Sequence, residues 1–269
     1  SLSAGARGFR LGHADGVARP STERDVADLL SSASAVLPIG AQSSLTGGAT
    51  PHGGIVLSLE RFTDIQMLDA DRVQVGAGVP LMVLQDALAD VHRWYPPVPT
   101  FAGAWVGGVI ATNAAGAATF KYGATRQWVD AITVVLACGC VLDLARGETP
   151  ADRADGWRIT CAHGDRHLLP ATYAMPDVAK CSAGYFAAAG MDLIDLFIGS
   201  EGTLGVITSA VLRTRPETPS FAMALITTTS EAAALALTGD LRDAAQHTWS
   251  SRDANGIDIS AIEYMDRRC

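Results

Sequence analysis

The stretch Val36-Leu-Pro-Ile-Gly-Ala-Gln-Ser-Ser-Leu-Thr-Gly-Gly-Ala49 runs from an apolar segment into a loop made almost entirely of small residues. A second apolar run, residues 55–59, follows closely, so we expect a strand, a loop and another strand. Small side chains leave successive backbone N–H groups accessible, and a concave row of N–H groups binds anions. The loop is therefore either an ordinary Gly-rich turn or a site that wraps a diphosphate.

Two common phosphate-binding patterns do not fit this loop. In a Rossmann unit the Gly-rich turn follows G-x-G-x-x-G and opens a helix. Here Pro51-His-Gly-Gly54 follows the loop and prevents a helix. The P-loop spacing with its Lys is also absent. A nucleotide bound at this loop would need another architecture.

The composition is that of a globular protein. Apolar residues make up 48% of the 269 residues and charged residues 18%, which excludes a disordered chain. The net charge of −8 argues against a nucleic-acid partner, because no basic stripe is available to neutralise phosphates. The length allows one large domain or two ordinary ones.

Several features bear on location. No apolar segment is long enough to span a membrane, and residues 1–10 lack the pattern of a signal peptide. The five cysteines are irregularly spaced, which indicates reduced thiols. We therefore expect a cytoplasmic protein, with peripheral membrane association left open. The chain begins without Met, so we expect a processed, trimmed or incomplete product.

Local patterns predict the other elements. A helix capped by Ser21 or Thr22 precedes the opening strand, and another helix starts at Pro80. Residues 146–180 are expected to be an irregular excursion. Further strands are expected at 65–68, 73–75, 131–137, 141–144, 206–213 and 222–228, and helices at 193–197 and 231–245.

Candidate metal ligands are few. Cys138 and Cys140 lie at the predicted turn after residues 131–137, but no second pair at zinc spacing accompanies them. His163 and His167 have no third His or Cys nearby, so we expect surface histidines. We predict no metal site.

Two further stretches of small residues stand out. Residues 100–118 are mostly Gly and Ala, with Thr112 and Asn113 among them. They form either a tightly packed helix or a wall against a planar ring, to which Thr112 and Asn113 would supply hydrogen bonds. Residues 199–205 are a third small-residue loop. Within it, Glu201 is an N-cap carboxylate, a contact to the edge of a flavin or a solvated side chain.

Together these segments resemble a known family. The matching segments are Pro38-Ile-Gly-Ala-Gln-Ser-Ser-Leu-Thr-Gly-Gly48, Val106-Gly-Gly-Val-Ile-Ala-Thr-Asn-Ala-Ala-Gly116, Lys121-Tyr-Gly123 with Thr125-Arg126, and Gly199-Ser-Glu-Gly-Thr-Leu-Gly-Val-Ile-Thr208. They occur in the order of the FAD-binding domain of the vanillyl-alcohol oxidase / p-cresol methylhydroxylase (PCMH) superfamily. The resemblance is strongest to its FAD-linked oxidases, such as D-lactate dehydrogenase and the glycolate oxidase flavin subunit. It covers roughly residues 15–215.

The resemblance implies an α+β fold, the two-subdomain PCMH-type FAD-binding fold, with FAD between the subdomains. The FAD-binding domain would span residues 1–215, with subdomains of about 1–59 and 60–215. Residues 216–269 would be the start of an α+β substrate (cap) domain that is incomplete in this chain.

The resemblance also implies the cofactor site. The first loop would hold the FAD pyrophosphate, the second stretch would line the isoalloxazine ring and ribityl chain, and the third loop would pack around the adenosine half and the flavin edge. The implied cofactor-binding residues are Ile39, Gly40, Ala41, Gln42, Ser43, Ser44, Thr100, Gly103, Gly108, Thr112, Asn113, Ala115, Gly116, Tyr122, Gly123, Glu201, Gly202, Gly205, Val206 and Ile207.

Two departures from the family pattern matter. Many relatives have Gly or a bulky polar residue where Ala41 and Gln42 stand, so the local donor geometry is expected to differ. Covalent members of the superfamily often carry a flavin-linked His in this loop, where this chain has Ser43. We therefore expect non-covalent FAD.

The implied reaction transfers a hydride from a CH–OH group, of a 2-hydroxy acid, to flavin N5 while a base takes the hydroxyl proton. The sequence identifies neither that base nor the electron acceptor. Lys121 and Arg126 either balance charge near the flavin or are structural. The alternative is a flavin-binding fragment or subunit without turnover of its own, which needs a partner or the missing C-terminal half. A homodimer is also open, and a third hypothesis is a flavin-free carbohydrate- or peptide-binding scaffold.

Overall fold

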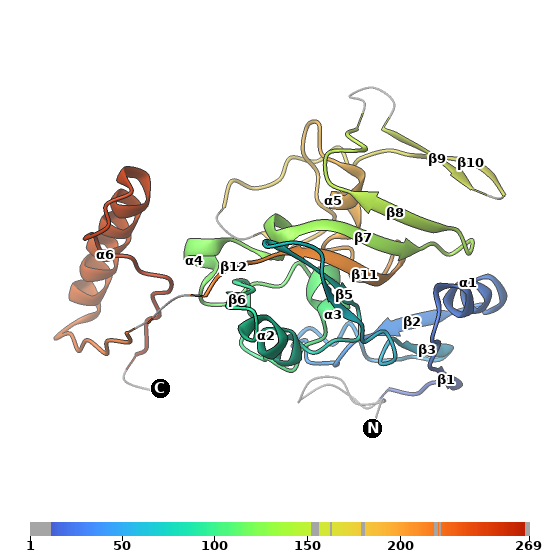
Figure 1. Ribbon diagram of the computed structural model, residues 1–269, viewed down its shortest axis with the longest axis horizontal. Coiled ribbons are helices and arrows are strands. Elements are labelled where there is room, and N and C mark those ends of the chain that lie inside the picture. The colour runs from blue at the N-terminus through green and yellow to red at the C-terminus, as the bar shows by residue number, and fades with distance from the viewer. Residues whose placement is uncertain are drawn as a thin grey trace.

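The computed structural model describes residues 12–151, 156–161, 163–178, 181–217, 220 and 222–266, so the outer ends of the predicted domains lie outside the described residues. The strands are β1 (Gly16–Ala18), β2 (Val36–Ile39), β3 (Ile55–Ser58), β4 (Ile65–Met67), β5 (Arg72–Gly76), β6 (Arg93–Trp94), β7 (Val129–Val135), β8 (Val141–Ala145), β9 (Trp157–Cys161), β10 (Gly164–Leu168), β11 (Val206–Arg213) and β12 (Arg215–Pro216). The helices are α1 (Glu23–Ser32), α2 (Leu81–Ala89), α3 (Val106–Ala111), α4 (Thr119–Tyr122), the short 3-10 helix η1 (Thr125–Trp128), α5 (Leu193–Phe197) and α6 (Glu231–Ser251). This mixture of helices and strands, with two separate main sheets, is the predicted α+β class (Figure 1).

A small parallel sheet holds the opening loop. Its order is β1-β3-β2, and Val36 of β2 pairs with Ile55 of β3 in parallel. Parallel neighbours need a long crossover connection, which is usually a helix. Here the connection is the small-residue loop between Ile39 and Ile55. The loop is therefore a crossover whose course is set by the strands at both ends.

Helix α1 covers this sheet. Thr22 accepts a hydrogen bond from the backbone N–H of Asp25, and the Asp25 carboxylate accepts one from the N–H of Thr22. This reciprocal capping box is the predicted start signal. Val26 of α1 is fully buried against Leu57 and Val206, which ties the small sheet to the large one.

The larger sheet is antiparallel, in the order β4-β5-β11-β7-β8. Alternate residues such as Val73, Val134 and Leu212 are fully buried and form the main core. Helix α3 contacts β5 and β11, and α5 contacts β8. The register between β11 and β7 shifts between Ile207 and Ser209, which is a bulge at the end of β11 nearest the third small-residue loop.

Two predictions of secondary structure are wrong. Residues 222–228 contain no strand, and Met223 and Leu225 there are 94% and 79% exposed. An apolar run forms a strand only beside a partner, and no described strand pairs with it. Residues 146–180 are not wholly irregular, because β9 and β10 form a hairpin within them. The rest of the predicted strands and helices are present, with ends shifted by a few residues.

The C-terminal part, residues 222–266, contacts the predicted FAD-binding region through α4. The Trp249 ring of α6 lies 5.0 Å from that of Phe120, and Lys121 pairs with Asp258 at 2.6 Å. Helix α6 otherwise stands apart from the two sheets (Figure 1). No described helix is both long enough and apolar enough to cross a membrane.

Candidate functional site

The opening loop is held in shape by its own side chains. Gln42 has a positive φ of 52°, and its side-chain amide donates to the Ala49 carbonyl at 2.8 Å. Within the part of the chain that the structure describes, the N–H groups of Gly40, Ala41 and Ser43 donate to no backbone carbonyl. These N–H groups are therefore available to an anion, as the diphosphate hypothesis requires.

The second small-residue stretch, residues 100–118, contains a packed helix, which is one of its two predicted forms. This helix is α3. Its glycines Gly107 and Gly108 allow close packing on the large sheet and on the opening loop. A Cβ atom on Gly107 would lie 2.7 Å from the Cβ of Ala77, and one on Gly108 would lie 4.0 Å from the Cα of Gly40. Gly107 is thus required by packing on the large sheet, whereas Gly108 faces the opening loop.

The third loop meets the other two. The N–H of Glu201 donates to the Ala111 carbonyl at the end of α3 at 2.7 Å. A Cβ atom on Gly202 would lie 2.7 Å from Pro38, and one on Gly48 would lie 3.6 Å from the Glu201 carboxylate. Three segments far apart in the sequence therefore converge on one site.

The convergence is marked by unusual backbone. Among the described non-Gly residues, positive φ occurs at Gln42, His92, Asn113, Glu201 and Arg252. Three of these lie in the site, one in each small-residue segment: Gln42, Asn113 and Glu201, with φ of 52°, 44° and 55°. Such conformations cost about 1–3 kcal/mol each and cluster at ligand sites.

Asn113 and Thr112 are engaged with the protein. Asn113 is 6% exposed, and its Oδ1 accepts the backbone N–H of Arg126 at 2.9 Å. The Thr112 hydroxyl donates to the Gly108 carbonyl, within α3, at 2.8 Å. The amide nitrogen of Asn113 and the lone pairs of Thr112 remain as groups that could face a ring.

Arg126 fastens the third loop. Its guanidinium donates to the Asp195 carboxylate at 3.0 Å and to the carbonyls of Asp195 and Ile198, and it lies over the Phe186 ring at 4.1 Å. Burial lowers the pKa of Arg126, and the Asp195 carboxylate opposes that shift. Arg146 pairs with the same carboxylate at 3.1 Å. These contacts assign Arg126 a structural role. No local pattern predicted Asp195 as its partner, because the two residues are far apart in the chain.

The segment around Tyr122 is also built into the fold. Tyr122 is buried, and its ring packs edge-on against Trp94 at 5.2 Å. Gly123 has a φ of 73° and leaves no room for a side chain beside Gln127. Lys121 pairs with Asp258, so its charge is not free to balance a flavin.

The remaining predicted residues divide into three groups. Ile39, Val206 and Ile207 have buried side chains, so only their backbone could contact a cofactor. A Cβ on Gly205 would lie 2.5 Å from Val134, and one on Gly116 would lie 2.1 Å from the Val98 carbonyl. The accessible or half-buried remainder is Ser44, Thr100, Gly103 and Ala115.

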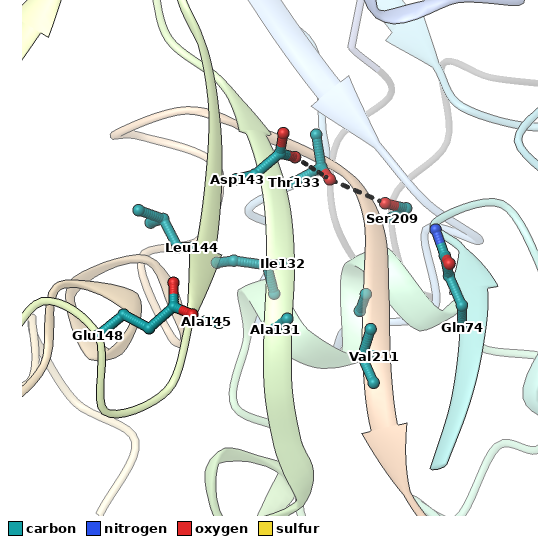
Figure 2. Close-up of a pocket in the computed structure, with 11 residues that line it drawn as sticks. Gln74, Ala131, Ile132, Thr133, Asp143, Leu144, Ala145, Glu148, Ser209 and Val211 are labelled. Carbon is teal, nitrogen blue, oxygen red and sulfur yellow. Dashed lines mark hydrogen bonds between the residues drawn. The ribbon is translucent and has the colours of Figure 1, made fainter. Parts of the chain in front are cut away.

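A further groove lies elsewhere. It has a volume of about 240 Å³ and crosses β5, β11, β7 and β8. Figure 2 shows the side chains that line it on these neighbouring strands. Ser209 donates to Thr133 at 3.1 Å, and Thr133 donates to Asp143 at 2.8 Å. None of the predicted cofactor residues lines it, and these polar groups satisfy one another. We assign it no function.

The class of protein follows from these features together with the sequence comparison. Residues 14–145 match the family model described as an FAD binding domain. This part of the chain therefore matches an FAD-binding domain, and FAD is its cofactor.

Particular relatives agree with this class. The chain is 35% identical to the D-lactate dehydrogenase of Archaeoglobus fulgidus, over 75% of the chain and 39% of the relative. It is 34% identical to the D-2-hydroxyglutarate dehydrogenase of Xanthomonas citri pv. viticola, over 71% of the chain and 34% of the relative. An alkyldihydroxyacetonephosphate synthase shares the fold, with a TM-score of 0.57 at 17% identity over 84% of this chain and 36% of that one. The chain thus spans well under half the length of these proteins.

The residues present fit FAD. A diphosphate needs N–H donors that are not occupied by the chain, and Gly40, Ala41 and Ser43 provide them within the described residues. A flat ring needs a wall without bulky side chains, and the small half-buried residues Gly108 and Ala115 would suit one. These loops would hold the cofactor, which supplies the redox chemistry.

Proposed function

We propose that this chain is the FAD-binding part of an oxidoreductase that oxidises the CH–OH group of a 2-hydroxy acid. The support is the match of residues 14–145 to an FAD binding domain together with relatives named as D-lactate and D-2-hydroxyglutarate dehydrogenases. The observation that carries the proposal is the meeting of the three small-residue segments at Gly40, Gly108 and Gly202. The proposed domain division remains 1–215 for the FAD-binding domain and 216–269 for the start of a cap domain.

In this reaction the hydroxy acid loses the hydrogen on Cα as a hydride and the hydroxyl hydrogen as a proton, which leaves a 2-oxo acid. Bound FAD supplies the two-electron acceptor. The protein's part is to bind and orient it through the N–H groups of the opening loop and the wall of α3. We assign the base to none of the described residues, because the titratable side chains beside the loops are either paired, as Arg126 is, or exposed, as Glu201 is.

We also propose that the FAD is held without a covalent bond. Residues 40–49 contain no His, Cys or Tyr, which are side chains able to form a bond to the flavin ring. Ser43 is exposed in this loop. Acid precipitation of the loaded protein should leave the yellow colour in the supernatant. Colour that stays with the pellet would overturn this part of the proposal.

A second candidate function is a flavin-binding subunit without turnover of its own. It is favoured because no described side chain beside the loops is assigned as the base. This second candidate would need a partner next to the flavin. We also propose a cytoplasmic location.

One experiment separates the candidates. The protein is loaded with FAD, freed of excess cofactor by gel filtration and mixed anaerobically with D-lactate, glycolate or D-2-hydroxyglutarate. Bleaching of the flavin absorbance by a hydroxy acid, but not by succinate, is the expected result for the oxidoreductase. Retained flavin that no hydroxy acid bleaches would support the subunit without turnover. Protein that retains no flavin would contradict both.

A further inference from the structure

A cluster of three cysteines lies outside the FAD loops. Cys138 and Cys140 occupy the turn between β7 and β8, and Cys161 ends β9. Their sulfur atoms all lie within 4.8 Å of one another, and those of Cys138 and Cys161 are 3.8 Å apart. The pair in the turn lacks a second pair at zinc spacing along the sequence, but the fold supplies the third thiol from a separate hairpin.

The turn presents its two thiols together. The Leu136 N–H donates to the Cys140 carbonyl at 2.8 Å, and the Gly139 N–H donates to the Leu136 carbonyl at 2.8 Å. Gly139 has a φ of 80°, which lets the chain reverse tightly between the two cysteines. A side chain at this position would also meet Ser31 of α1, at 2.6 Å from its Cβ. The turn is thus fixed by its hydrogen bonds and by its packing on α1.

The spacing suits a metal–thiolate site. Zinc–sulfur bonds of about 2.3 Å at tetrahedral angles place neighbouring sulfur atoms about 3.8 Å apart. The Cys138–Cys161 separation of 3.8 Å equals that value without any movement. A disulfide needs a sulfur–sulfur distance of about 2.05 Å, which the separation of 3.8 Å does not meet. Thiolates select soft ions such as Zn²⁺ and Cu(I).

We propose that Cys138, Cys140 and Cys161 form a three-thiolate site for a soft metal ion, with Zn²⁺ as the reference ion. Cys161 is 7% exposed, and the two turn cysteines are half-buried beside the main core, so the ion would lie at the edge of a dry region. Among the described residues no His, Asp or Glu joins the cluster, which leaves a fourth position for water or an added ligand. Binding would release protons from the thiols. The sequence-based prediction of no metal site missed this cluster because Cys161 is distant in the chain.

The test uses the whole chain, reduced and stripped of metal with a chelator. Titration with Co²⁺ should give a thiolate charge-transfer band that saturates at one ion per chain, and Zn²⁺ should remove that band by competition. Cys138→Ser and Cys161→Ser should each weaken Co²⁺ binding at least 100-fold. Cys181→Ser, a half-buried cysteine outside the cluster, is the matched control and should bind as the unaltered chain does.

A second measurement covers variants that fail to fold. In the unaltered chain, saturating Zn²⁺ should protect the three clustered thiols from alkylation, read by mass spectrometry, while Cys181 stays reactive. Three results would overturn the proposal. The first is that the three thiols stay reactive at saturating Zn²⁺. The second is that folded Cys138→Ser and Cys161→Ser still bind Co²⁺ as the unaltered chain does. The third is a Cys138–Cys161 disulfide in protein that, once reduced, binds no metal.

Discussion

At the scale of single residues, the site depends on positive φ angles, which are uncommon for residues other than glycine. Gln42, Asn113 and Glu201 each have a positive φ and a hydrogen bond that holds them. The Gln42 side chain donates to the Ala49 carbonyl, and the Asn113 side chain accepts the backbone N–H of Arg126. The backbone N–H of Glu201 donates to the Ala111 carbonyl. Strain of this kind persists only where the surroundings impose it. The residues that matter most are therefore those that hold the loops, and Arg126 is the main one.

Removing Arg126 should destabilise the fold and the site together. Arg126→Met leaves the buried Asp195 carboxylate with Arg146 as its remaining cation. We expect the unfolding free energy to fall by about 3 kcal/mol, because the carbonyls of Asp195 and Ile198 lose a buried charged donor and the Asp195 carboxylate loses one of its two cations. Urea unfolding measures this. Arg72→Met is the control, since its pair with Asp69 is exposed and screened by solvent and should contribute little to stability. Equal losses in the two variants would contradict the role assigned to Arg126.

The two glycines Gly202 and Gly190 provide a sharper comparison at the same scale. Both have positive φ, 76° and 69°, but a Cβ on Gly202 would lie 2.7 Å from Pro38 whereas one on Gly190 would meet nothing within 4 Å. Alanine at either position should cost about 1 kcal/mol of backbone strain. Gly202→Ala should cost a further 1–3 kcal/mol, roughly the penalty for overpacking, and should weaken FAD binding. If thermal unfolding and FAD titration find the two variants alike, the third loop does not seat on Pro38.

At the scale of elements, the loops are defined by what lies at their ends. The opening loop joins parallel strands β2 and β3, so its ends are fixed on the same sheet. Helix α1 covers that sheet and connects it to β11 through Val26 and Val206. Stability of α1 should therefore matter to the site although α1 lies outside it.

The capping box of α1 gives a measurable effect. Thr22→Ala removes the acceptor for the Asp25 N–H and should cost about 1 kcal/mol. The Ser21 N–H and the Thr22 side chain hold the pKa of Asp25 below its usual value. A lowered carboxyl pKa stabilises the fold above the unfolded-state pKa, so this contribution is lost as the pH falls below about 4. Urea unfolding at pH 7 should give a lower unfolding free energy for Thr22→Ala than for the control Ser31→Ala. No difference between them would contradict the capping role.

Sequence patterns predicted most elements but not how they meet. Period and turn residues located the helix at residues 23–32 and the hairpin of β7 and β8. The strand expected at 222–228 was wrong, because an apolar run carries no information about whether a partner strand exists. The site was predicted as three segments, since small-residue runs are local signals. The pairing of Arg126 with Asp195 and of Cys138 with Cys161 could not be predicted, because both depend on tertiary contacts between distant residues.

At the scale of the whole molecule, the C-terminal part is held by few contacts. Lys121 pairs with Asp258, whose pKa is lowered first by Lys121 and then by Trp249. In the same C-terminal part, the side chains of Met223, Leu225 and Leu235 are largely exposed and do not pack into a core. We therefore expect the two sheets and the FAD loops to fold without support from this part.

Breaking the Lys121–Asp258 pair should loosen the C-terminal part alone. In Asp258→Asn we expect faster hydrogen exchange in residues 245–258 with FAD affinity unchanged. In the unaltered chain the same loosening should appear as the pH falls below about 4, because the lowered pKa of Asp258 makes its contribution present above that pH and lost below it. Arg242→Met, which removes an exposed local pair with Asp243, is the control. A loss of FAD affinity in Asp258→Asn would show that this part supports the site.

The central claim is that the opening loop holds the FAD diphosphate, and FAD titration of Gly40→Val tests it most directly. A Cβ at Gly40 would make only ordinary contacts, the nearest at 3.6 Å, so the fold should survive while the larger side chain enters the space of the cofactor. Gly239→Val in α6, where a Cβ would meet nothing within 4 Å, is the matched control. We predict that Gly40→Val remains folded and binds FAD at least tenfold more weakly than the control. Folded Gly40→Val protein with unchanged FAD affinity would mean that the loop is only a turn.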